Sequence, residues 1–422
     1  MLLSLKKVGK IKEATINING LTVIAGKNDT GKSTVGKVLY AVCRALGMYT
    51  TFFDDLEKDK LVANTVIPLF KKYIANNAGT SELAKELASL LEDIPNNPYN
   101  QLKVNDLTLE QVKELLSRIK QSTNNDKDIN ALLDEAFSEV IKIEKTPAHT
   151  KLARTLRTTL RFVFAGEVLN SKYHETANLQ ISVNNNEVVA AEISNKGITA
   201  NINEILATTF FKRVLYAESP LVLENIESAF KPHWYEMQQF IKRWSSTGAW
   251  NQPSVNEDLL QFIQKQIFGD SQIVFDEKNN TFRYQVDNTA SALDMQNVAF
   301  GMKSFSLIFL LLKLNLLTKG ATLLILDEPE NHLHPEWQIK YAEMICLMVS
   351  KGFSIVLTSH SPTFIQALEA YGRKFQIQDK ASFYLAEKIE NENYSRLTDV
   401  TSNIERIAEN LIEPMDKLFL GV

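Results

Sequence analysis

Cysteine and histidine are scarce in this chain. Its 422 residues include only two cysteines and six histidines. Cys43 and Cys346 both lie in apolar stretches with helical spacing, so they provide neither a disulfide framework nor the paired spacing of a zinc site. Such cysteine usage is typical of proteins in a reducing compartment, and we expect a cytoplasmic protein.

Long hydrophobic runs and internal repeats are also missing. The longest apolar stretch, Phe305–Leu317, contains Lys313 and is shorter than the ~20 residues that a helix needs to cross a bilayer. The first residues, MLLSLKKVGKIK, carry too many lysines and too short an apolar run for a signal peptide. These absences argue against a membrane protein and favour Phe305–Leu317 as a buried helix.

Neither positive nor negative side chains are in large excess. The net charge is −4, and the hydrophobic and charged fractions of 45% and 23% are ordinary for a globular protein. No global field therefore draws the chain to nucleic acid or to an anionic membrane, so any such contact has to be local. The length predicts roughly two to three domain-sized units.

One short segment, Gly26–Ser33, carries a specific motif. Its sequence, GKNDTGKS, matches the phosphate-binding loop G-x-x-x-x-G-K-[ST] at every defined position. Glycines let the backbone turn its N–H groups toward phosphate oxygens, the lysine brings positive charge to the terminal phosphates, and the serine hydroxyl can bind Mg²⁺. An apolar strand precedes the loop and a helical pattern follows it, so the helix dipole adds to the attraction. The sequence predicts a nucleoside triphosphate site formed by Gly26, Lys27, Asn28, Asp29, Thr30, Gly31, Lys32, Ser33 and Thr34.

A second motif, TLLILDEPE, covers Thr322–Glu330. Its apolar run predicts a buried parallel strand that ends in Asp327 and Glu328, at the edge where α/β sheets bind their ligands. We expect Asp327 to orient Mg²⁺ and Glu328 to act as the general base on the attacking water. The alternative is a surface Asp-Glu turn before Pro329.

The segment FSIVLTSH predicts another buried strand, which ends at His360. A histidine at a strand end is often only a solvated side chain. This strand follows the carboxylate strand by one helix, however, so His360 is placed where a side chain can sense the terminal phosphate.

The alternation of strands and helices after Ala321 indicates parallel strands joined by helical crossovers. Residues 51–165 carry helical patterns such as TSELAKELASLLEDI and LTLEQVKELLSRIKQS, each opening with a threonine cap. The predicted fold class is α/β, a P-loop head with a mixed sheet, a helical insertion and a helical lobe. The predicted divisions are the head's N-terminal part (1–50), the helical insertion (51–165), an antiparallel sheet and a head strand (166–220), a helical region with a hairpin (221–290) and the head's C-terminal part (291–422).

These motifs, in this order, resemble the ABC-type ATPase head within the AAA family. LLILDEPENHLHPEWQ and VLTSHSP look most like the OLD-family and Septu-type (PtuA) ATPases of bacterial anti-phage defence, and more distantly like SMC heads. The resemblance covers roughly residues 1–50 and 290–370. It implies ATP and Mg²⁺ as cofactors, held between two heads that pack head to tail. It carries site roles over to Lys32, Ser33, Asp327, Glu328 and His360, with Lys32, Glu328 and His360 catalytic and with Ser33 and Asp327 at the metal.

In such heads a signature loop from the opposing subunit reaches the terminal phosphate. Its place here is Val298–Ser304, VAFGMKS, where Gly301 and the following helix N-terminus can present N–H groups to phosphate. Relatives usually carry Ser or Thr before that glycine, whereas this chain has Phe300, so slow turnover is expected. Glu218 lies near the position of a glutamine that links the metal to the helical lobe in such heads.

Two further groups of residues have competing interpretations. The segment Glu330–Glu336 contains two histidines and two more acids, which fits either a metal cluster or, by the resemblance, the dimer seam. Four cations share one face of a predicted helix, where they grip nucleic acid or an acidic partner, or else form a solvated surface. They are Lys151, Arg154, Arg157 and Arg161.

The main functional hypothesis is an ATPase that assembles around nucleotide and regulates a separate effector, a nuclease or toxin, in anti-phage defence. OLD-family proteins add a Toprim nuclease after the head. The roughly 50 residues that follow the last motif helix here hold no acidic D-x-D group, so cutting would fall to another chain. One alternative is an SMC-like repair ATPase that acts on DNA directly. Another is a nucleotide-sensing scaffold with little turnover.

Overall fold

The computed structural model describes residues 1–77, 81–92, 103–123, 126–169, 176–207, 211–224, 232–246, 250, 252–276, 278–279, 281–287 and 291–420. The chain divides into two compact units, one formed by Met1–Gly47 with Leu156–Val422 and the other by Met48–Thr155. The boundaries fall within or beside two helices, α1 (Lys32–Leu61) and α6 (Ala148–Val163).

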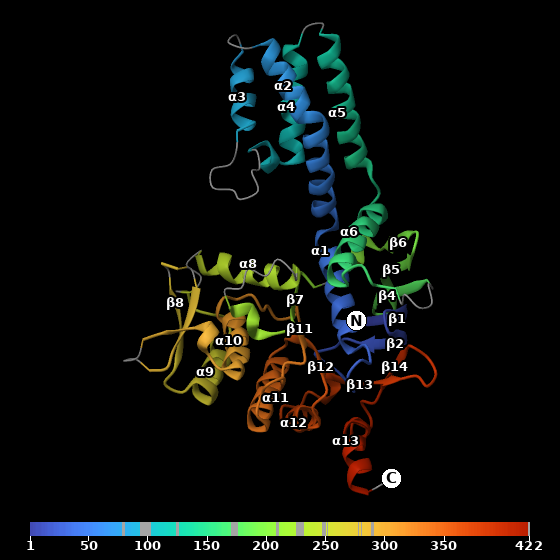
Figure 1. Cartoon of the computed structure of the whole chain (residues 1–422), viewed down its shortest axis with the longest axis vertical. Coiled ribbons are helices and arrows are strands. Elements are labelled where there is room, and N and C mark those ends of the chain that lie inside the picture. Colours follow the sequence, from blue (N-terminus) through green and yellow to red (C-terminus); the bar gives the residue numbers. More distant parts are fainter. Residues whose placement is uncertain are drawn as a thin grey trace. The chain divides into compact units, whose positions relative to one another are not determined.

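The larger unit is built on a mixed sheet of eleven strands (Figure 1), so the α/β fold class expected from the sequence is confirmed. Five neighbouring strands run parallel, in the order β13-β3-β12-β11-β7, and β6-β5-β4-β1-β2-β14 continue the sheet beyond β13. The strands are β1 (Leu2–Val8), β2 (Ile11–Asn17), β3 (Leu21–Gly26), β4 (Ala177–Val183), β5 (Asn186–Ser194), β6 (Gly197–Ile202), β7 (Arg213–Ala217), β11 (Thr322–Asp327), β12 (Ser354–Ser359), β13 (Ala381–Lys388) and β14 (Ser395–Asp399).

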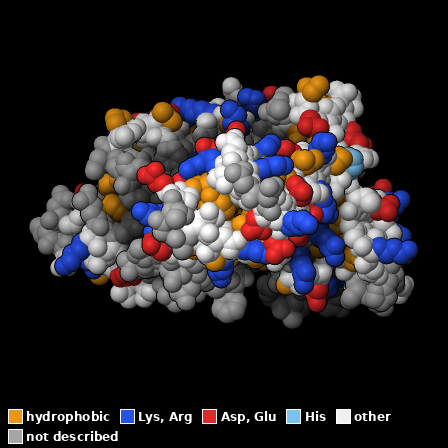
Figure 2. All heavy atoms as spheres, turned by 90° about the horizontal axis from the view of Figure 1, so that it is seen from above, with side chains coloured by type: hydrophobic (Ala, Val, Ile, Leu, Met, Phe, Trp, Pro, Cys, Tyr) orange, Lys and Arg blue, Asp and Glu red, His pale blue; other side chains and the backbone are white. Residues whose placement is uncertain are grey.

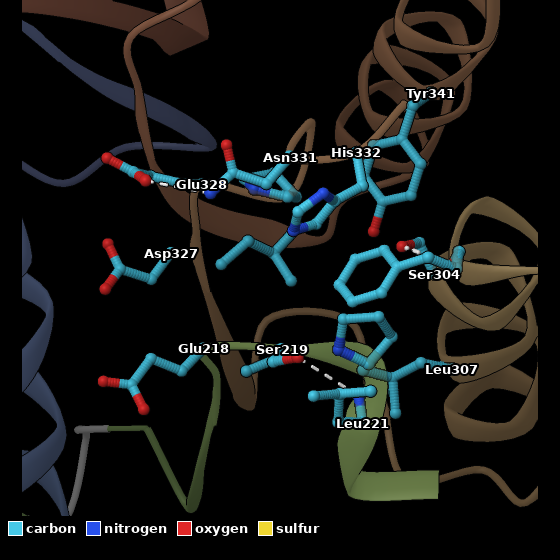
Figure 3. A pocket seen from close by; sticks show the side chains of 15 residues that line it. Glu218, Ser219, Leu221, Ser304, Leu307, Asp327, Glu328, Asn331, His332 and Tyr341 are labelled. Carbon is cyan, nitrogen blue, oxygen red and sulfur yellow. Dashed lines mark hydrogen bonds between the residues drawn. The ribbon is translucent and has the colours of Figure 1, made fainter. Parts of the chain in front are cut away.

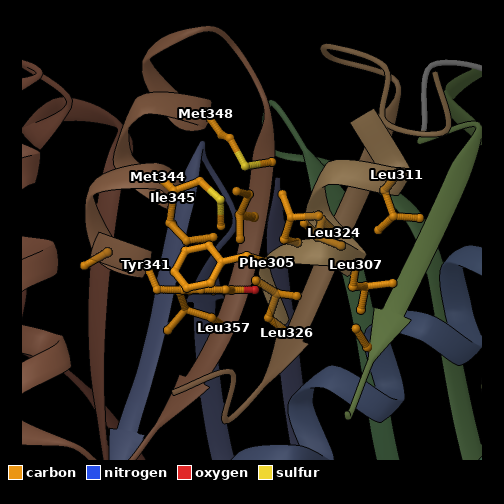
Figure 4. Close-up of a cluster of buried hydrophobic side chains, with 14 of the residues drawn as sticks. Phe305, Leu307, Leu311, Leu324, Leu326, Tyr341, Met344, Ile345, Met348 and Leu357 are labelled. Atoms are coloured by element: carbon orange, nitrogen blue, oxygen red, sulfur yellow. The ribbon is translucent and has the colours of Figure 1, made fainter. Parts of the chain in front are cut away.

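The central strands are buried because helices cover them. β3, β11 and β12 are almost continuously apolar, as strands covered on both faces must be. Figure 4 shows Phe305 and Tyr341 packed over Leu324, Leu326 and Leu357 of the sheet. The helices of this part are α10 (Phe300–Lys313), α11 (Pro335–Ser350), α12 (Pro362–Lys374) and α13 (Glu405–Leu420).

The helix expected over Phe305–Leu317 begins and ends earlier than its sequence predicts. α10 begins at Phe300, after an N-cap residue, Ala299, that makes no side-chain hydrogen bond to mark the start. It ends at Lys313 because Asn315 adopts a left-handed backbone, with φ of 52°. The remaining apolar residues stay buried in the turn that leads to β11.

The antiparallel strands expected between residues 179 and 202 do form, but not as a separate sheet. β4 pairs with β1 as well as with β5, so the three strands extend the main sheet. The N-terminal strand β1 has partners on both edges, β2 and β4. Such pairing links residues far apart in the sequence, and local alternation of side chains cannot reveal it.

The region between β7 and α10 holds helices and a small sheet. The described elements include α8 (Pro232–Ser246) and α9 (Glu257–Ile263), followed by a sheet in the order β10-β9-β8. Its strands are β8 (Gln272–Asp276), β9 (Thr281–Gln285) and β10 (Leu293–Asp294). Among the described residues, no helix combines the length and apolar character of a membrane span.

The smaller unit is helical, and its helices bury one core of their own. Thr108 starts α4 with a capping box, as its sequence predicts, whereas the threonine expected to cap the preceding helix lies outside the described residues and Ser81 caps α3. The break expected at NPYN also lies outside them. Besides α1, the helices are α2 (Ile67–Asn76), α3 (Glu82–Leu90), α4 (Leu109–Ser122) and α5 (Lys127–Lys145).

We expect Gly36 of α1 to be required for the close approach of this helix to the sheet. A Cβ atom at Gly36 would lie 3.1 Å from Cγ2 of Ile325 and 3.4 Å from Cε2 of Tyr216. Gly36→Leu should therefore lower the free energy of unfolding by about 1–3 kcal/mol through overpacking. Gly47→Leu is the matched control, since nothing lies within 4 Å of a Cβ at Gly47 in the same helix. Equal chemical-denaturation midpoints for the two variants would contradict this account.

Candidate functional site

The predicted phosphate loop lies between β3 and α1, and its backbone curls tightly. Gly26 has a φ of 154°, and a Cβ there would overlap the carbonyl oxygen of Ala386 in the next strand. Asp29 and Gly31 adopt left-handed conformations, with φ of 64° and 82°. The Thr30 hydroxyl donates back across the loop to the carbonyl of Lys27, at 2.8 Å. The glycines of the motif are thus explained by backbone geometry.

The side chain of Lys32 is folded into the site. Its ammonium group donates to the carbonyl oxygen of Lys27 at 3.0 Å and lies 3.5 Å from Oε1 of Glu328. Only 4% of the residue is exposed. A cation held so deeply needs electronegative partners, and these two oxygens supply them.

Asp327, at the end of β11, accepts hydrogen bonds from three hydroxyl groups. Oδ1 accepts a hydrogen bond from the Ser33 hydroxyl, at 3.0 Å, and another from the Thr358 hydroxyl of β12. Oδ2 accepts from the Tyr216 hydroxyl of β7, also at 3.0 Å. A fixed carboxylate beside a serine hydroxyl is the oxygen donor set that Mg²⁺ takes at phosphate-binding sites, so the two residues expected at the metal fit that ion.

Glu328 has partners separate from those of Asp327. Its backbone is left-handed, with φ of 48°, and its N–H donates to the Thr358 hydroxyl at 3.0 Å. Oε1 lies 3.2 Å from Nδ1 of His360, and Oε2 accepts from the Asn331 amide at 2.9 Å. His360, followed by Asn331, lowers the pKa of Glu328 to about 2. The carboxylate is therefore ionised throughout the physiological range.

His360 lies directly after β12, beside the carboxylate. The contact with Glu328 raises the pKa of the imidazole, which favours its charged form. Lys32 and His360 thus approach the same oxygen of Glu328, at 3.5 and 3.2 Å. The structure brings together all five residues to which the sequence assigned the phosphates, the metal and the chemistry: Lys32, Ser33, Asp327, Glu328 and His360.

A cavity of about 700 Å³ opens over the loop, within the usual size range of ligand pockets. Asn28, Thr30 and Thr34 line it together with Lys32, Ser33 and Glu328. Its other walls come from Gly9, Lys10, Lys37, Val163, Phe164, Ala165, Glu167, Leu169 and Asn393. The cavity is large enough for a nucleoside whose phosphates reach the loop.

The remaining predicted loop residues hold the loop in place. Lys27 pairs with Glu413 of α13, and neither Gly26 nor Lys27 lines the cavity. Asp29 pairs with Lys10 and, at 3.2 Å, with Lys388. The side chains of Lys27 and Asp29 therefore bind neighbouring elements.

A second, smaller cavity of about 190 Å³ adjoins the carboxylates on another side. Figure 3 shows the carboxylates of Glu218, Asp327 and Glu328 on one side of it, with Leu307 and Tyr341 opposite. Glu218 lies 3.3 Å from Nε2 of the buried His233 of α8. Glu218 is thus both near Asp327 and in contact with the helical region that follows β7.

Gly301 and Phe300 form the first turn of α10, away from the phosphate loop. Gly301 does not line the larger cavity, and a Cβ there would lie 3.0 Å from Cδ2 of Leu333. The ring of Phe300 meets the ring of His332 edge to face, with centroids 4.7 Å apart. Phe300 lines the smaller cavity together with Asp327 and Glu328.

The segment Glu330–Glu336 does not form a metal cluster. Glu330 is buried against Ser359, and His334 caps α11 by accepting the N–H of Glu336 at 3.4 Å. His332 packs on Phe300. In the part of the chain that the structure describes, no group of three or more His, Cys, Asp and Glu side chains is placed to hold a metal ion.

The four cations of α6 do not act as one surface. Lys151 is buried and pairs with Asp54 at 2.7 Å, and Arg154 lies 3.6 Å from Glu57. Arg157 and Arg161 are exposed and line a groove with the β5–β6 turn. On the face in Figure 2, basic and acidic side chains are interspersed.

Several residues of the site were not predicted from the sequence. Tyr216 and Thr358 hold Asp327, and Asn331 holds Glu328. Thr358 and Asn331 lie inside the motifs TSHSP and DEPEN, so their closeness to the acids was a usable signal. No such signal marks Tyr216, because its contact with Asp327 depends on the pairing of β7 with β11.

Solved structures of SMC heads resemble this chain at low sequence identity. The SMC head domain from Thermotoga maritima matches with a TM-score of 0.40 and 12% identity, over 94% of this chain and 98% of that one. An Smc head with an extended coiled coil, bound to the C-terminal domain of ScpA from Pyrococcus furiosus, matches at 0.44 and 9%, over 97% and 98%. These likenesses are distant. No curated protein matches significantly.

A match to a family model identifies the family of the chain more firmly than the distant structural likenesses do. The model described as the AAA ATPase domain matches residues 3–365, which include the phosphate loop, both acids and His360. This match covers most of the chain, and the protein belongs to the AAA ATPase domain family.

Proposed function

We propose that this protein is a cytoplasmic ABC-type ATPase that binds ATP with Mg²⁺, hydrolyses it slowly and assembles head to tail around it. The observation that carries the proposal is that Lys32 and His360 both lie within 3.5 Å of Oε1 of Glu328, beside Ser33 bonded to Asp327. This arrangement supplies the parts that phosphoryl transfer to water requires.

We expect ATP binding to replace the present partners of the Lys32 ammonium group with phosphate oxygens. In the free site its charge is balanced by Glu328 and by the Lys27 carbonyl. A triphosphate carries more negative charge and offers better acceptors, so its terminal phosphates would take the ammonium group. Ser33 and Asp327 would hold Mg²⁺, which offsets phosphate charge when bound.

Hydrolysis depends on the basicity of Glu328. At a pKa of about 2 the carboxylate is a poor base, because general bases work best with a pKa near the operating pH. When Lys32 and His360 turn to the phosphate, the cations that lower this pKa move away. Glu328 then becomes a stronger base beside the attacking water, so the base is activated by the substrate itself.

We also propose that the chain assembles with a second copy of itself and regulates another protein. Gly301 does not line the cavity over this chain's own phosphate loop, so we propose that it reaches the phosphate of a second subunit through backbone N–H groups. The resemblance of the motifs DEPENHLHP and TSHSP to OLD-family and Septu-type ATPases supports a role in anti-phage defence. In that role the ATPase would regulate a separate effector, a nuclease or toxin.

Direct contact with nucleic acid, as in an SMC-like repair ATPase, is the second candidate. It rests on Arg157 and Arg161, which are exposed one helical turn apart in a groove. The pairing of Lys151 and Arg154 with carboxylates removes half of the basic face and weakens this candidate.

We expect Lys32→Ala to abolish ATP binding, because it removes the charge that the terminal phosphates require. Glu328→Gln should keep ATP binding and slow hydrolysis by roughly 100-fold or more, as loss of a general base does. It should also trap a dimer with ATP, to be detected by light scattering after size exclusion. Wild-type turnover in Glu328→Gln would contradict the assigned base. If ATP binds the wild-type chain without turnover, the protein is a nucleotide-sensing scaffold instead.

The substitution Phe300→Ser tests why turnover is slow. A serine restores the hydroxyl that relatives place before the glycine, so we expect faster ATP hydrolysis and a more stable ATP-dependent dimer. Phe300→Ala is the matched control, because it also removes the ring from His332 but adds no hydroxyl. Equal rates for the two variants would show that the hydroxyl plays no part.

Charge reversal tests the second candidate. If Arg157 and Arg161 bind phosphate, the double variant Arg157→Glu/Arg161→Glu should lose salt-dependent binding to a labelled DNA duplex, and the salt slope should fall by about 2. Lys142→Glu, an exposed cation of α5, serves as the control. No binding by the wild-type chain at low salt would dismiss the candidate.

A further inference from the structure

Glu330 is a buried acid that the proposed chemistry does not use. It follows Glu328 by two residues but is only 2% exposed. Its Oε1 accepts the Ser359 hydroxyl at 2.5 Å and the backbone N–H of His360 at 3.1 Å. Its Oε2 is buried and has no hydrogen-bond partner among the described residues. Buried carboxyl groups are uncommon, so this one requires a physical reason.

The environment of Glu330 favours its neutral form. Burial raises the pKa of the carboxyl group, and the bonds from Ser359 and His360 only partly oppose this effect. A proton on Oε2 would leave Oε1 free to accept both hydrogen bonds. A buried carboxylate would be costly, and the nearby His360 only partly offsets this cost.

The turn after β11 directs the two glutamates to opposite sides. Left-handed backbone at Glu328 and His332, with φ of 48° and 63°, frames the turn. The N–H of Asn331 donates to the Glu328 carbonyl at 3.1 Å, and that of Leu333 to the Glu330 carbonyl at 3.0 Å. Glu328 therefore lies in the site, while Glu330 lies beneath the end of β12.

His360 is consequently held at two points. Glu330 binds its backbone N–H, and Glu328 lies 3.2 Å from its imidazole. The Ser359 hydroxyl continues the chain of bonds by accepting the N–H of Ser361 at 3.1 Å, and Ser361 caps α12. Rotation of the peptide before His360 would break these bonds and displace the imidazole, whose side chain is 38% exposed.

We propose that Glu330 is a positioning residue for ATP hydrolysis, which fixes the backbone from which the His360 imidazole reaches the terminal phosphate by binding the His360 N–H and the Ser359 hydroxyl. This inference rests on the ATPase function proposed above. Lys32 and Ser33 make no contact with Glu330, so the positioning affects the chemical step and leaves the affinity for ATP unchanged.

Two substitutions at Glu330 separate positioning from simple support of the fold. Glu330→Ala should lower kcat by roughly 10- to 100-fold, since small displacements of catalytic groups have effects of this size, with the Kd for ATP unchanged. Glu330→Gln should keep near wild-type kcat, because its amide oxygen can accept the same two bonds. Glu369→Ala, which removes the partner of Arg373 on α12, is the control and should match the wild type.

A double-mutant cycle with His360→Ala tests whether Glu330 acts through the histidine. In the His360→Ala background, Glu330→Ala should lower kcat by less than about two-fold, because the group it positions is gone. An equal loss in both backgrounds, a wild-type kcat in Glu330→Ala, or weakened ATP binding with an unchanged kcat would overturn the proposal. Should Glu330→Ala fail to fold, Glu330→Asp, whose carboxyl is drawn back by one methylene, carries the same cycle.

The proposed function and this inference fail in different ways. If Lys32→Ala and Glu328→Gln leave hydrolysis intact, the assigned site is wrong and Glu330 has nothing to position. If those variants behave as expected and Glu330→Ala hydrolyses ATP normally, only the positioning role is overturned.

Discussion

The parallel register of β3, β12 and β11 is the constraint on which the site depends. Ser359 is paired with Ala25, and Asp327 with Thr358, so the carboxyl ends of three strands coincide. Neighbouring strands lie about 4.8 Å apart, which brings side chains from distant parts of the chain within hydrogen-bond reach. A slip of one residue would turn Asp327 and Thr358 to opposite faces of the sheet. The buried apolar runs of these strands exclude that slip, so the packing of the core also sets the geometry of the site.

At this edge of the sheet two cationic side chains lie against one carboxylate. Lys32 and His360 both lie against Glu328, and the cost of burying the lysine is offset by the carboxylate. The same contacts make the carboxylate a weak base, which suits a site that should not act without its substrate. A triphosphate is the kind of ligand that can redistribute these partners, since it attracts both cations and leaves the glutamate behind. Binding and activation are then a single electrostatic event.

The parts of the site that could be predicted were those with local signals. The loop residues Gly26 and Gly31 need unusual backbone angles, and the apolar runs before Asp327 and His360 mark buried strands. What could not be predicted depends on contacts between distant segments: Tyr216 meets Asp327 only through strand pairing, and Lys151 is neutralised by Asp54 of another helix. For the same reason the local sequence of β4–β6 predicts a small sheet, although these strands extend the main one. The start of α10 carries no capping signal in the sequence, because Ala299 has no side chain that can cap a helix.

Phe300 shows how a departure from a motif can have a structural cause. Its ring packs on His332, in the turn whose Asn331 amide binds Glu328. The same helix start is fixed on its other side by Leu333, which leaves no room for a side chain at Gly301. The first turn of α10 is thereby fastened to the turn that orients the base. A serine in place of Phe300 would give a second subunit a hydroxyl but would loosen this attachment, so the chain exchanges a hydrogen-bond donor for rigidity beside its own carboxylate.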